Sequence, residues 1–137
     1  MMRCLVTGGA GFIGSHIAER LLKDGHYVRV LDNFSSGREE NLCFTKGLGK
    51  DRFTLIKGDI REKAACGKAC QSIGYVFHQA ALRSVPKSLK EPGKYNEVNI
   101  NGTLNMLQAA SENKVKRFVF ASSSSVYGEV DEFPEKE

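Results

Sequence analysis

The sequence predicts an α/β domain in which helices cover both faces of one parallel sheet. Short apolar runs, typical of buried strands, alternate with longer stretches that have the periodicity of amphipathic helices. A glycine-rich turn follows the first apolar run, and polar residues gather where the later runs end. Right-handed crossovers between such strands predict a doubly wound sheet with the strand order 3-2-1-4-5.

The first strand is the short apolar run that ends at Thr7, and a helix is predicted soon after it. Between them, Gly8, Gly11 and Gly14 stand three residues apart, and the G-x-G-x-x-G spacing also fits from Gly9. The early glycines let the backbone approach a pyrophosphate, and the free N–H groups of the helix N-terminus face that anion. The segment therefore predicts a Rossmann-type domain that binds a dinucleotide.

The helix after the turn is predicted from an apolar stripe made of Ile13, Ile17, Leu21 and Leu22. The next strand is predicted over 27–31, and Asp32 stands at its end, where the fingerprint places an acid for the adenosine ribose hydroxyls. Because Asp32 would repel a ribose 2′-phosphate, NAD is favoured over NADP. Arg29 and Arg38 are the counter-argument, since an arginine can pair with such a phosphate.

The rest of the chain continues the alternation. Strands are expected at 53–57, 75–77 and 115–121, and helices at 38–46, 62–72 and 95–113. The last helix is expected to carry Ile100, Leu104, Leu107 and Ala110 on one side, and the proline-marked stretch 82–92 is expected to be a loop. Ligands of such sheets bind at the carboxyl ends of the strands, so the loops there are the predicted site.

Length and composition fit a single domain over 1–137, with 41% hydrophobic residues and a net charge of +4. The basic residues are scattered, so a nucleic-acid partner is not indicated. The chain has neither a long apolar span nor a signal peptide, so we expect no membrane partner and a cytoplasmic location. The four cysteines lack the paired spacing of a metal site, and no metal is predicted.

Six segments resemble, in order, the extended short-chain dehydrogenase/reductase family: TGGAGFIG, LDNFSSG, GDIR, HQAALRSVPKS, NINGTLNMLQAA and FASSSSVYG. Within that family they are most similar to the NAD-dependent UDP-sugar 4-epimerases that act on UDP-glucose or UDP-N-acetylglucosamine. The resemblance covers essentially the whole chain. It implies NAD as the cofactor, a UDP-sugar as the substrate, and a homodimer formed partly through the helix at 95–113.

The resemblance also implies which residues contact the cofactor: Gly8, Gly11, Phe12, Ile13, Gly14, Asp32, Asn33, Ser36, Gly37, Asp59, Ile60, Gln79, Ala80 and Ala81. Asp59 and Ile60 match the pair beside the adenine ring, where a carboxylate can accept a hydrogen bond from the exocyclic amine. An alternative role for Asp59 is that of a helix N-cap. His78 is expected to be structural, and Asn99 matches an asparagine that ties the long helix to neighbouring loops.

For the substrate, Ser84 and Val85 match the loop that borders the sugar. Four consecutive serines follow the last strand, and their alternative interpretation is a solvated loop. Aligned on the Val-Tyr-Gly that follows them, Ser123 takes the position of the family's catalytic serine or threonine, and Ser124 and Ser125 fall where substrate is contacted. Sugar-nucleotide 4,6-dehydratases carry an acidic pair at these last two positions, because eliminating water needs a general acid and a base. Hydroxyls there disfavour dehydration.

The family's catalytic tyrosine and lysine form a Tyr-x-x-x-Lys motif, which these 137 residues do not contain. We therefore interpret the chain as the cofactor-binding half of a longer UDP-sugar 4-epimerase, truncated before the sugar-binding portion and inactive on its own. One alternative is another extended-family sugar-nucleotide enzyme, such as a dehydratase, decarboxylase or reductase. A second alternative is a non-catalytic dinucleotide-binding module.

Overall fold

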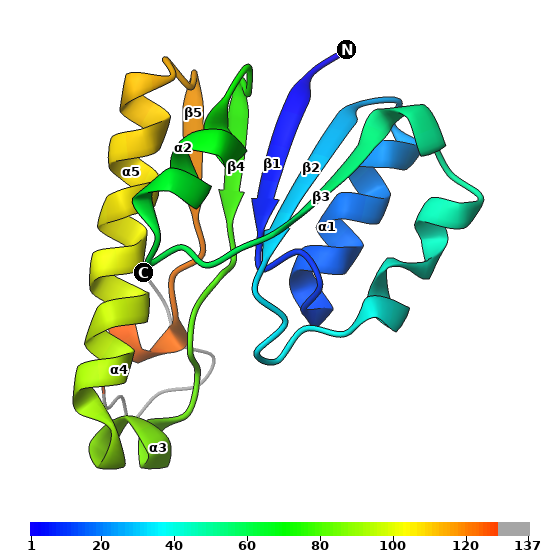
Figure 1. The fold of residues 1–137 in the computed structure, drawn as a ribbon. Coiled ribbons are helices and arrows are strands. Elements are labelled where there is room, and N and C mark those ends of the chain that lie inside the picture. Colours follow the sequence, from blue (N-terminus) through cyan, green and yellow to red (C-terminus); the bar gives the residue numbers. More distant parts are fainter. Residues whose placement is uncertain (129–137) are drawn as a thin grey trace.

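The computed structural model describes residues 1–128, without the side chains of residues 50, 124 and 125. Its centre is a five-stranded parallel sheet in the order β3-β2-β1-β4-β5 (Figure 1). The strands are β1 (Arg3–Thr7), β2 (Tyr27–Asp32), β3 (Phe53–Lys57), β4 (Tyr75–His78) and β5 (Arg117–Phe120). The predicted doubly wound, Rossmann-type order 3-2-1-4-5 is confirmed.

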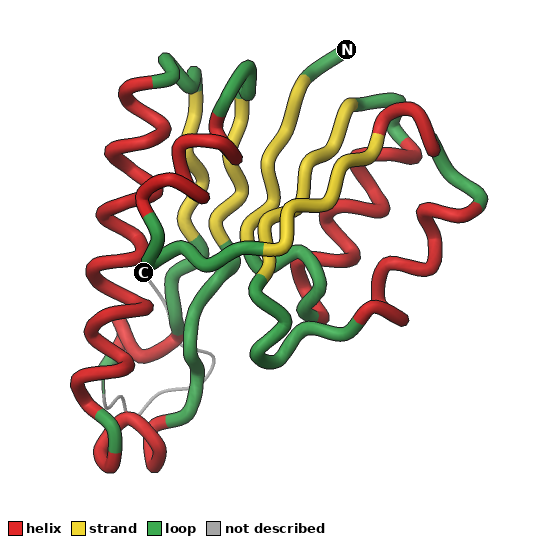
Figure 2. Tube along the Cα trace, in the orientation of Figure 1, coloured by secondary structure: helices red, strands yellow, loops and turns green. Residues whose placement is uncertain are grey.

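Helices cover the sheet on two faces, as Figure 2 shows. On one face, α1 (Phe12–Lys23) packs over Val6 and Val30. On the other face, α2 (Lys63–Cys70) and α5 (Thr103–Glu112) pack over Leu5 and Leu31. Neighbouring strand residues enter different cores because side chains alternate along a strand. This arrangement leaves the carboxyl edge of the sheet to the connecting loops.

The predicted apolar stripe of α1 differs from the structure at Ile13. Ile13 is 57% exposed, whereas Leu22 is buried and Ala18 joins it in the core. Ile13 lies in the first turn of the helix, next to the glycine turn. Three short segments are 3-10 helices: η1 (Glu39–Lys46), η2 (Lys50–Arg52) and η4 (Ser124–Tyr127).

The stretch expected to be a loop at 82–92 is largely helical, so that prediction is wrong. It contains α3 (Val85–Lys90), and α4 (Pro92–Asn96) begins at its end. Pro86 and Pro92 stand in the first turns of these helices. A proline is tolerated there because its missing N–H would have no intrahelical partner. The prolines start helices here instead of excluding them.

The single helix expected at 95–113 is built from α4, the π-helical segment η3 (Glu97–Gly102) and α5. The four residues of its predicted apolar stripe are not all buried. Ile100, Leu104 and Leu107 are 61%, 51% and 45% exposed, and Ala110 is buried with Met106 in the core. A π-helical turn takes more residues than an α-helical turn and changes which residues face the core. Pairing of two copies through this helix stays a prediction.

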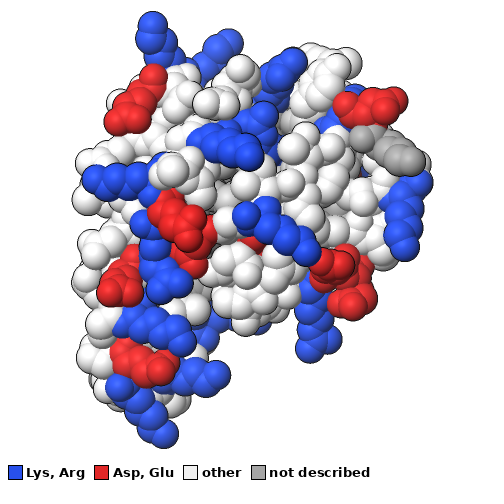
Figure 3. Space-filling view, in the orientation of Figure 1, with Lys and Arg blue, Asp and Glu red and all other residues white. Residues whose placement is uncertain are grey.

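Charges of both signs are intermingled on the face shown in Figure 3. Cys4, Cys66 and Cys70 are buried, whereas Cys43 is exposed. Burial raises the pKa of each of the three buried thiols to about 11. Among the described residues, no helix is long and apolar enough to cross a bilayer, and no three His, Cys, Asp or Glu side chains are grouped to hold a metal ion.

Candidate dinucleotide-binding site

A cleft of about 250 Å³ lies at the carboxyl edge of the sheet. It is formed by the loops that follow β1, β2, β3 and β4, as expected for a parallel α/β sheet. The cofactor residues implied by the sequence resemblance line this cleft with one exception, Asp59. Residues from four separate segments therefore meet in one place.

The glycine turn brings the start of α1 against the end of β1. The Gly8 amide donates to the Leu31 carbonyl at 2.8 Å, and the Gly11 amide donates to the Gly8 carbonyl at 3.0 Å. A Cβ atom on Gly14 would overlap the carbonyl oxygen of Gly8, so only glycine fits this crossing. Gly11 is the N-cap residue and has no side chain, so the N–H groups of the first helical turn stay available to an anion.

Asp32 lies directly against this turn. Its Oδ2 accepts the Ala10 amide at 2.9 Å, its Oδ1 accepts the Phe34 amide at 2.8 Å, and the residue is 8% exposed. A Cβ atom on Gly37 would lie 2.9 Å from Oδ1 of Asp32, so the loop after β2 must pass close to the carboxylate. The acid and the glycine turn are thus held together, as a dinucleotide site requires.

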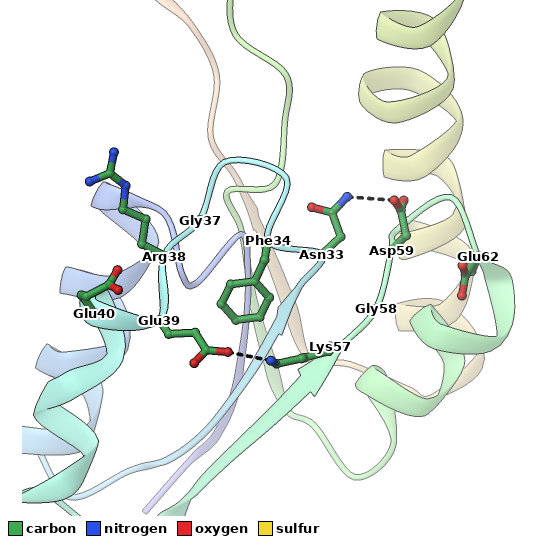
Figure 4. Close-up of a pocket in the computed structure, with 10 residues that line it drawn as sticks. All are labelled: Asn33, Phe34, Gly37, Arg38, Glu39, Glu40, Lys57, Gly58, Asp59 and Glu62. Atoms are coloured by element: carbon green, nitrogen blue, oxygen red, sulfur yellow. Dashed lines mark hydrogen bonds and ion pairs between the residues drawn. The ribbon is translucent and has the colours of Figure 1, made fainter.

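The two arginines that could have favoured NADP differ in their surroundings. Nη1 of Arg29 donates to the carbonyls of Ala69 at 2.9 Å and Gln71 at 2.8 Å, at the C-terminal end of α2. Arg38 follows Gly37 and lines a neighbouring recess that shares three residues with the cleft, and Figure 4 shows its side chain directed away from the other labelled residues. Neither arginine is among the residues that line the cleft.

A buried polar pair supports the floor of the cleft. Oγ1 of Thr7 accepts the Gln79 and Ala80 amides, each at 3.2 Å, and lies 2.8 Å from Nδ1 of His78. Because Thr7 already accepts two N–H groups, its hydroxyl hydrogen is the one shared with His78. Nδ1 is therefore the acceptor, and His78 carries its proton on Nε2.

The same network continues into the long helix. Nε2 of His78 is 3.1 Å from Oγ1 of Thr103, whose hydroxyl donates to the Asn99 carbonyl at 2.7 Å. The Asn99 side chain accepts the Leu82 amide at 2.8 Å and donates to the Leu82 carbonyl at 2.9 Å. Burial lowers the pKa of His78 to about 4. The structural role of His78 and the tie made by Asn99 are confirmed.

Asp59, the exception, lines a neighbouring recess of about 620 Å³ (Figure 4). Its carboxylate accepts four hydrogen bonds, three from Arg61 and one from Asn33. The side-chain hydrogen bond from Arg61 is the largest cause that holds the pKa of this carboxyl well below its usual range. The N-cap of α2 is Glu62, so the alternative role of Asp59 as a helix cap is wrong.

Charged side chains that line this recess pair with other residues of its lining. Nζ of Lys57 lies 2.6 Å from Oε1 of Glu39 and 5.1 Å from the centre of the Phe34 ring. Figure 4 shows this pair and the Asn33–Asp59 hydrogen bond at two edges of the recess. The mixed charges and internal pairing make the recess a less suitable anion site than the cleft.

Sequence reasoning missed three basic residues in the cleft: Arg61, Arg83 and Lys94. Arg61 is paired with Asp59 and Glu97. Lys94 lies 3.5 Å from Glu91, so acidic side chains outside the lining balance part of this positive charge. Arg61 follows directly on the Asp-Ile pair and could have been found there. Lys94 comes from α4, which the sequence pattern did not place near the glycine turn.

The implied substrate residues are not brought into the cofactor cleft. Ser84 is the N-cap residue of α3, and Val85 begins that helix with 70% of its surface exposed. Ser123 follows β5, and its carbonyl accepts the Val126 amide at 3.1 Å. Ser124 and Ser125 begin η4, and their side chains lie outside the described part of the structure.

A sheet of this order, with a glycine turn against an acid at the next strand tip, defines a Rossmann-type dinucleotide-binding domain. Residues 4–137 match the NAD dependent epimerase/dehydratase family, and the chain belongs to that family. The resemblance noted in the sequence is confirmed, and so is its implication that the family uses NAD.

Among related proteins, a UDP-glucose 4-epimerase from Klebsiella pneumoniae is 39% identical over 135 residues, which cover 97% of each chain. A UDP-N-acetyl-alpha-D-glucosaminuronate decarboxylase from Bacillus cytotoxicus is 41% identical over 92% of this chain and 38% of its own length. The chain thus spans nearly all of one relative and under half of another.

Among solved structures, the UDP-N-acetylglucosamine 4-epimerase from Methanobrevibacter ruminantium has a TM-score of 0.88 and 44% identity. The match covers 99% of this chain and 42% of that enzyme, which was solved with UDP-N-acetylmuramic acid. A UDP-glucose 4-epimerase from Thermus thermophilus, solved with NAD, has the same score, identity and coverage. A dTDP-glucose 4,6-dehydratase from Streptomyces venezuelae is 35% identical with a TM-score of 0.87, so dehydratases are relatives as well.

Proposed function

We propose that this chain binds NAD and supplies the cofactor-binding half of a UDP-sugar 4-epimerase. The observation that carries the proposal is the cleft, where the Asp32 carboxylate is fixed 2.9 Å from the Ala10 amide beside the start of α1. The diphosphate binds at the N-terminus of α1, and Asp32, Asn33, Ser36 and Gly37 hold the adenosine ribose. Gln79, Ala80 and Ala81 lie under the central part of the cofactor.

NAD, when bound, supplies a hydride acceptor that returns the hydride later in the reaction. The chain's own contribution is to bind and orient it. The glycine turn admits the diphosphate close to the backbone, and Arg83 and Lys94 add positive charge. The polar network of Thr7, His78 and Thr103 holds the Gln79 and Ala80 amides in place.

Several features support an epimerase over the alternatives. Ser124 and Ser125 replace the acidic pair of dehydratases, so elimination lacks its acid and base. We assign Ser123 the role of holding the reacting sugar oxygen and sharing its proton, with Ser84 and Val85 at the border of the sugar. A decarboxylase remains the second candidate, because one such relative is 41% identical.

Isothermal titration calorimetry with NADH and NADPH tests the cofactor assignment. We expect NADH to bind at least about tenfold more tightly, because a 2′-phosphate would be brought against the nearly buried Asp32 carboxylate. The Asp32→Asn variant removes that charge and is expected to reduce the difference between the affinities for NADH and NADPH. Tighter binding of NADPH by the unsubstituted chain would show that the assignment is wrong.

The prediction that the chain has no epimerase activity on its own can be tested directly. A coupled assay of UDP-glucose to UDP-galactose conversion is expected to show no turnover by these 137 residues, because they lack Tyr-x-x-x-Lys. In an enzyme that carries both this chain and that motif, Ser123→Ala is expected to lower turnover by about 10²-fold or more. A measurable rate from the chain alone contradicts the first expectation, and undiminished turnover of the variant contradicts the second.

A further inference from the structure

A polar side chain stands on the face of the long helix that packs inward. Gly102, Asn105 and Ala109 follow one another at intervals of three and four residues, so they share one face of this helix. Gly102 and Ala109 are buried, and Ala109 lies in the core with Met106. Asn105 is half-buried at the position between them. A polar group at such a position needs hydrogen-bond partners.

The partners of Asn105 belong to the loop that follows β3. Nδ2 of Asn105 donates to the Ile60 carbonyl at 3.1 Å and to the Arg61 carbonyl at 3.0 Å. This loop runs from the end of β3 to the start of α2, alongside α5 (Figure 1). One side-chain amide therefore holds two consecutive peptide units that are distant in the sequence.

The same loop packs closely against the helix one turn before Asn105. A Cβ atom on Gly102 would lie 2.7 Å from both Cδ1 and Cγ1 of Ile60, so the Ile60 side chain rests directly on the helix backbone. The Ile60 carbonyl also accepts Sγ of Cys66 at 3.1 Å. The loop is thus fixed on α5 by a packing contact and by hydrogen bonds to its own backbone.

This loop forms one wall of the proposed cofactor cleft. It contributes three of the lining residues, Gly58, Ile60 and Arg61. It is also joined to the loop after β2, because Nδ2 of Asn33 donates to Oδ2 of Asp59 at 2.8 Å. Asn33 follows Asp32, whose carboxylate lies against the glycine turn. A shift of the loop after β3 would therefore change the shape of the cleft beside this carboxylate.

We propose, building on the proposed binding of NAD in this cleft, that Asn105 is a positioning residue of the dinucleotide site. Its side-chain amide holds the loop after β3 in the binding geometry before the cofactor arrives. Asn105 is not among the residues that line the cleft, so it acts through Ile60 and Arg61. A loop that is already ordered loses less conformational entropy when a ligand binds, and this raises the affinity.

Calorimetry with NADH tests the proposal on the unsubstituted chain, Asn105→Ala and Asn105→Asp. Each affinity is corrected for the folded fraction that urea unfolding gives for that variant. We expect Asn105→Ala to bind NADH about tenfold more weakly, because the loop then has to be ordered on binding. Asn105→Asp keeps the shape of the side chain but places oxygen atoms against two carbonyls, so we expect at least the same loss.

Asn113→Ala is the matched control at the end of the same helix. Nδ2 of Asn113 donates to the Ala109 carbonyl at 2.8 Å, so this substitution removes a side-chain amide whose hydrogen bond stays within the helix. We expect it to leave the affinity for NADH unchanged. A purely structural role of Asn105 would lower the free energy of unfolding and leave the affinity of the folded chain intact.

Hydrogen exchange measures the order of the loop directly. The Glu62 amide donates to the Asp59 carbonyl at 3.0 Å and reports on this loop, with the amides of β1 as the reference. In Asn105→Ala we expect the Glu62 amide to exchange at least about tenfold faster relative to β1, and NADH to restore its protection. In the unsubstituted chain we expect NADH to change this relative rate by less than about threefold, because the loop is already in place.

Equal affinity for NADH in the folded Asn105→Ala and unsubstituted chains overturns the proposal, and so does an equal loss in Asn113→Ala. Asn105→Asp decides in the same way should the alanine variant fail to fold. If neither variant folds, a large gain of protection at Glu62 when the unsubstituted chain binds NADH overturns the proposal, because the loop would then be ordered by the cofactor. Failure of the unsubstituted chain to bind NADH overturns the proposed function itself.

Discussion

Replacing Gly14 with alanine is expected to abolish NAD binding and to lower the free energy of unfolding by about 3 kcal/mol or more. The new Cβ atom would overlap the carbonyl oxygen of Gly8 and lie 2.8 Å from the Cα atom of Gly9. These are backbone atoms of the turn, so no side-chain rotation can relieve the contact. Relief requires α1 to move away from β1, which opens the turn that faces the diphosphate.

The matched control is the same substitution at Gly67. This residue lies inside α2, and a Cβ atom there would meet nothing within 4 Å. Gly67→Ala is therefore expected to raise the free energy of unfolding by about 0.5–1 kcal/mol, because alanine favours the helix. Urea unfolding and NAD titration measure both variants. Equal stability of the two variants would show that the close crossing at Gly14 does not constrain the fold.

The parts of this molecule that could be predicted from sequence are those that depend on local chemistry. Gly14 and Asp32 were identified because a strand–turn–helix unit places a glycine crossing and an acid at fixed positions along the chain. The strand order followed from the alternation of elements and the handedness of their connections. Each of these rules needs only neighbouring residues, so no tertiary knowledge was required.

The parts that could not be predicted depend on contacts between distant segments. Ile100 fits a helical stripe, yet it is 61% exposed, because the side of this helix that meets the core is the one with Val98 and Met106. Pro86 indicates a loop by composition, although a proline is equally compatible with the backbone of a first helical turn. The contact of Asp59 with the adenine ring stays a prediction, and its pairing with Arg61 was not predicted because it depends on how the loop after β3 folds.

Lowering the pH from 6.5 to 4 is expected to destabilise the domain by about 3 kcal/mol through His78 alone. This side chain is 2% exposed, and burial lowers its pKa to about 4. The unfolded chain binds the proton with an ordinary pKa near 6.5, so it gains protons in this interval while the folded state does not. Stability is therefore greatest above pH 6.5 and falls as the pH approaches the folded pKa.

Protonation would also disturb the hydrogen bonds that support the cleft. Nδ1 of His78 accepts from the Thr7 hydroxyl, and a proton on Nδ1 would turn this acceptor into a donor. Thr7 already accepts the Gln79 and Ala80 amides at 3.2 Å, so the added proton has no free acceptor in that hydroxyl. Loss of NAD affinity is thus expected to accompany the loss of stability below the folded pKa.

Urea unfolding at half-unit steps between pH 7.5 and pH 4 measures this dependence. In the His78→Gln variant, which does not titrate, we expect the slope over this interval to become markedly flatter, whatever the variant's stability at pH 7.5. His16→Gln, at an exposed position on α1, serves as the matched control and should keep the slope of the unsubstituted chain. The carboxyl of Asp59, whose unfolded-state pKa is about 3.9, contributes mainly below about pH 5, and it contributes equally in His78→Gln, so the comparison of the two slopes removes it. A slope that survives in His78→Gln would mean that the histidine is not the group responsible.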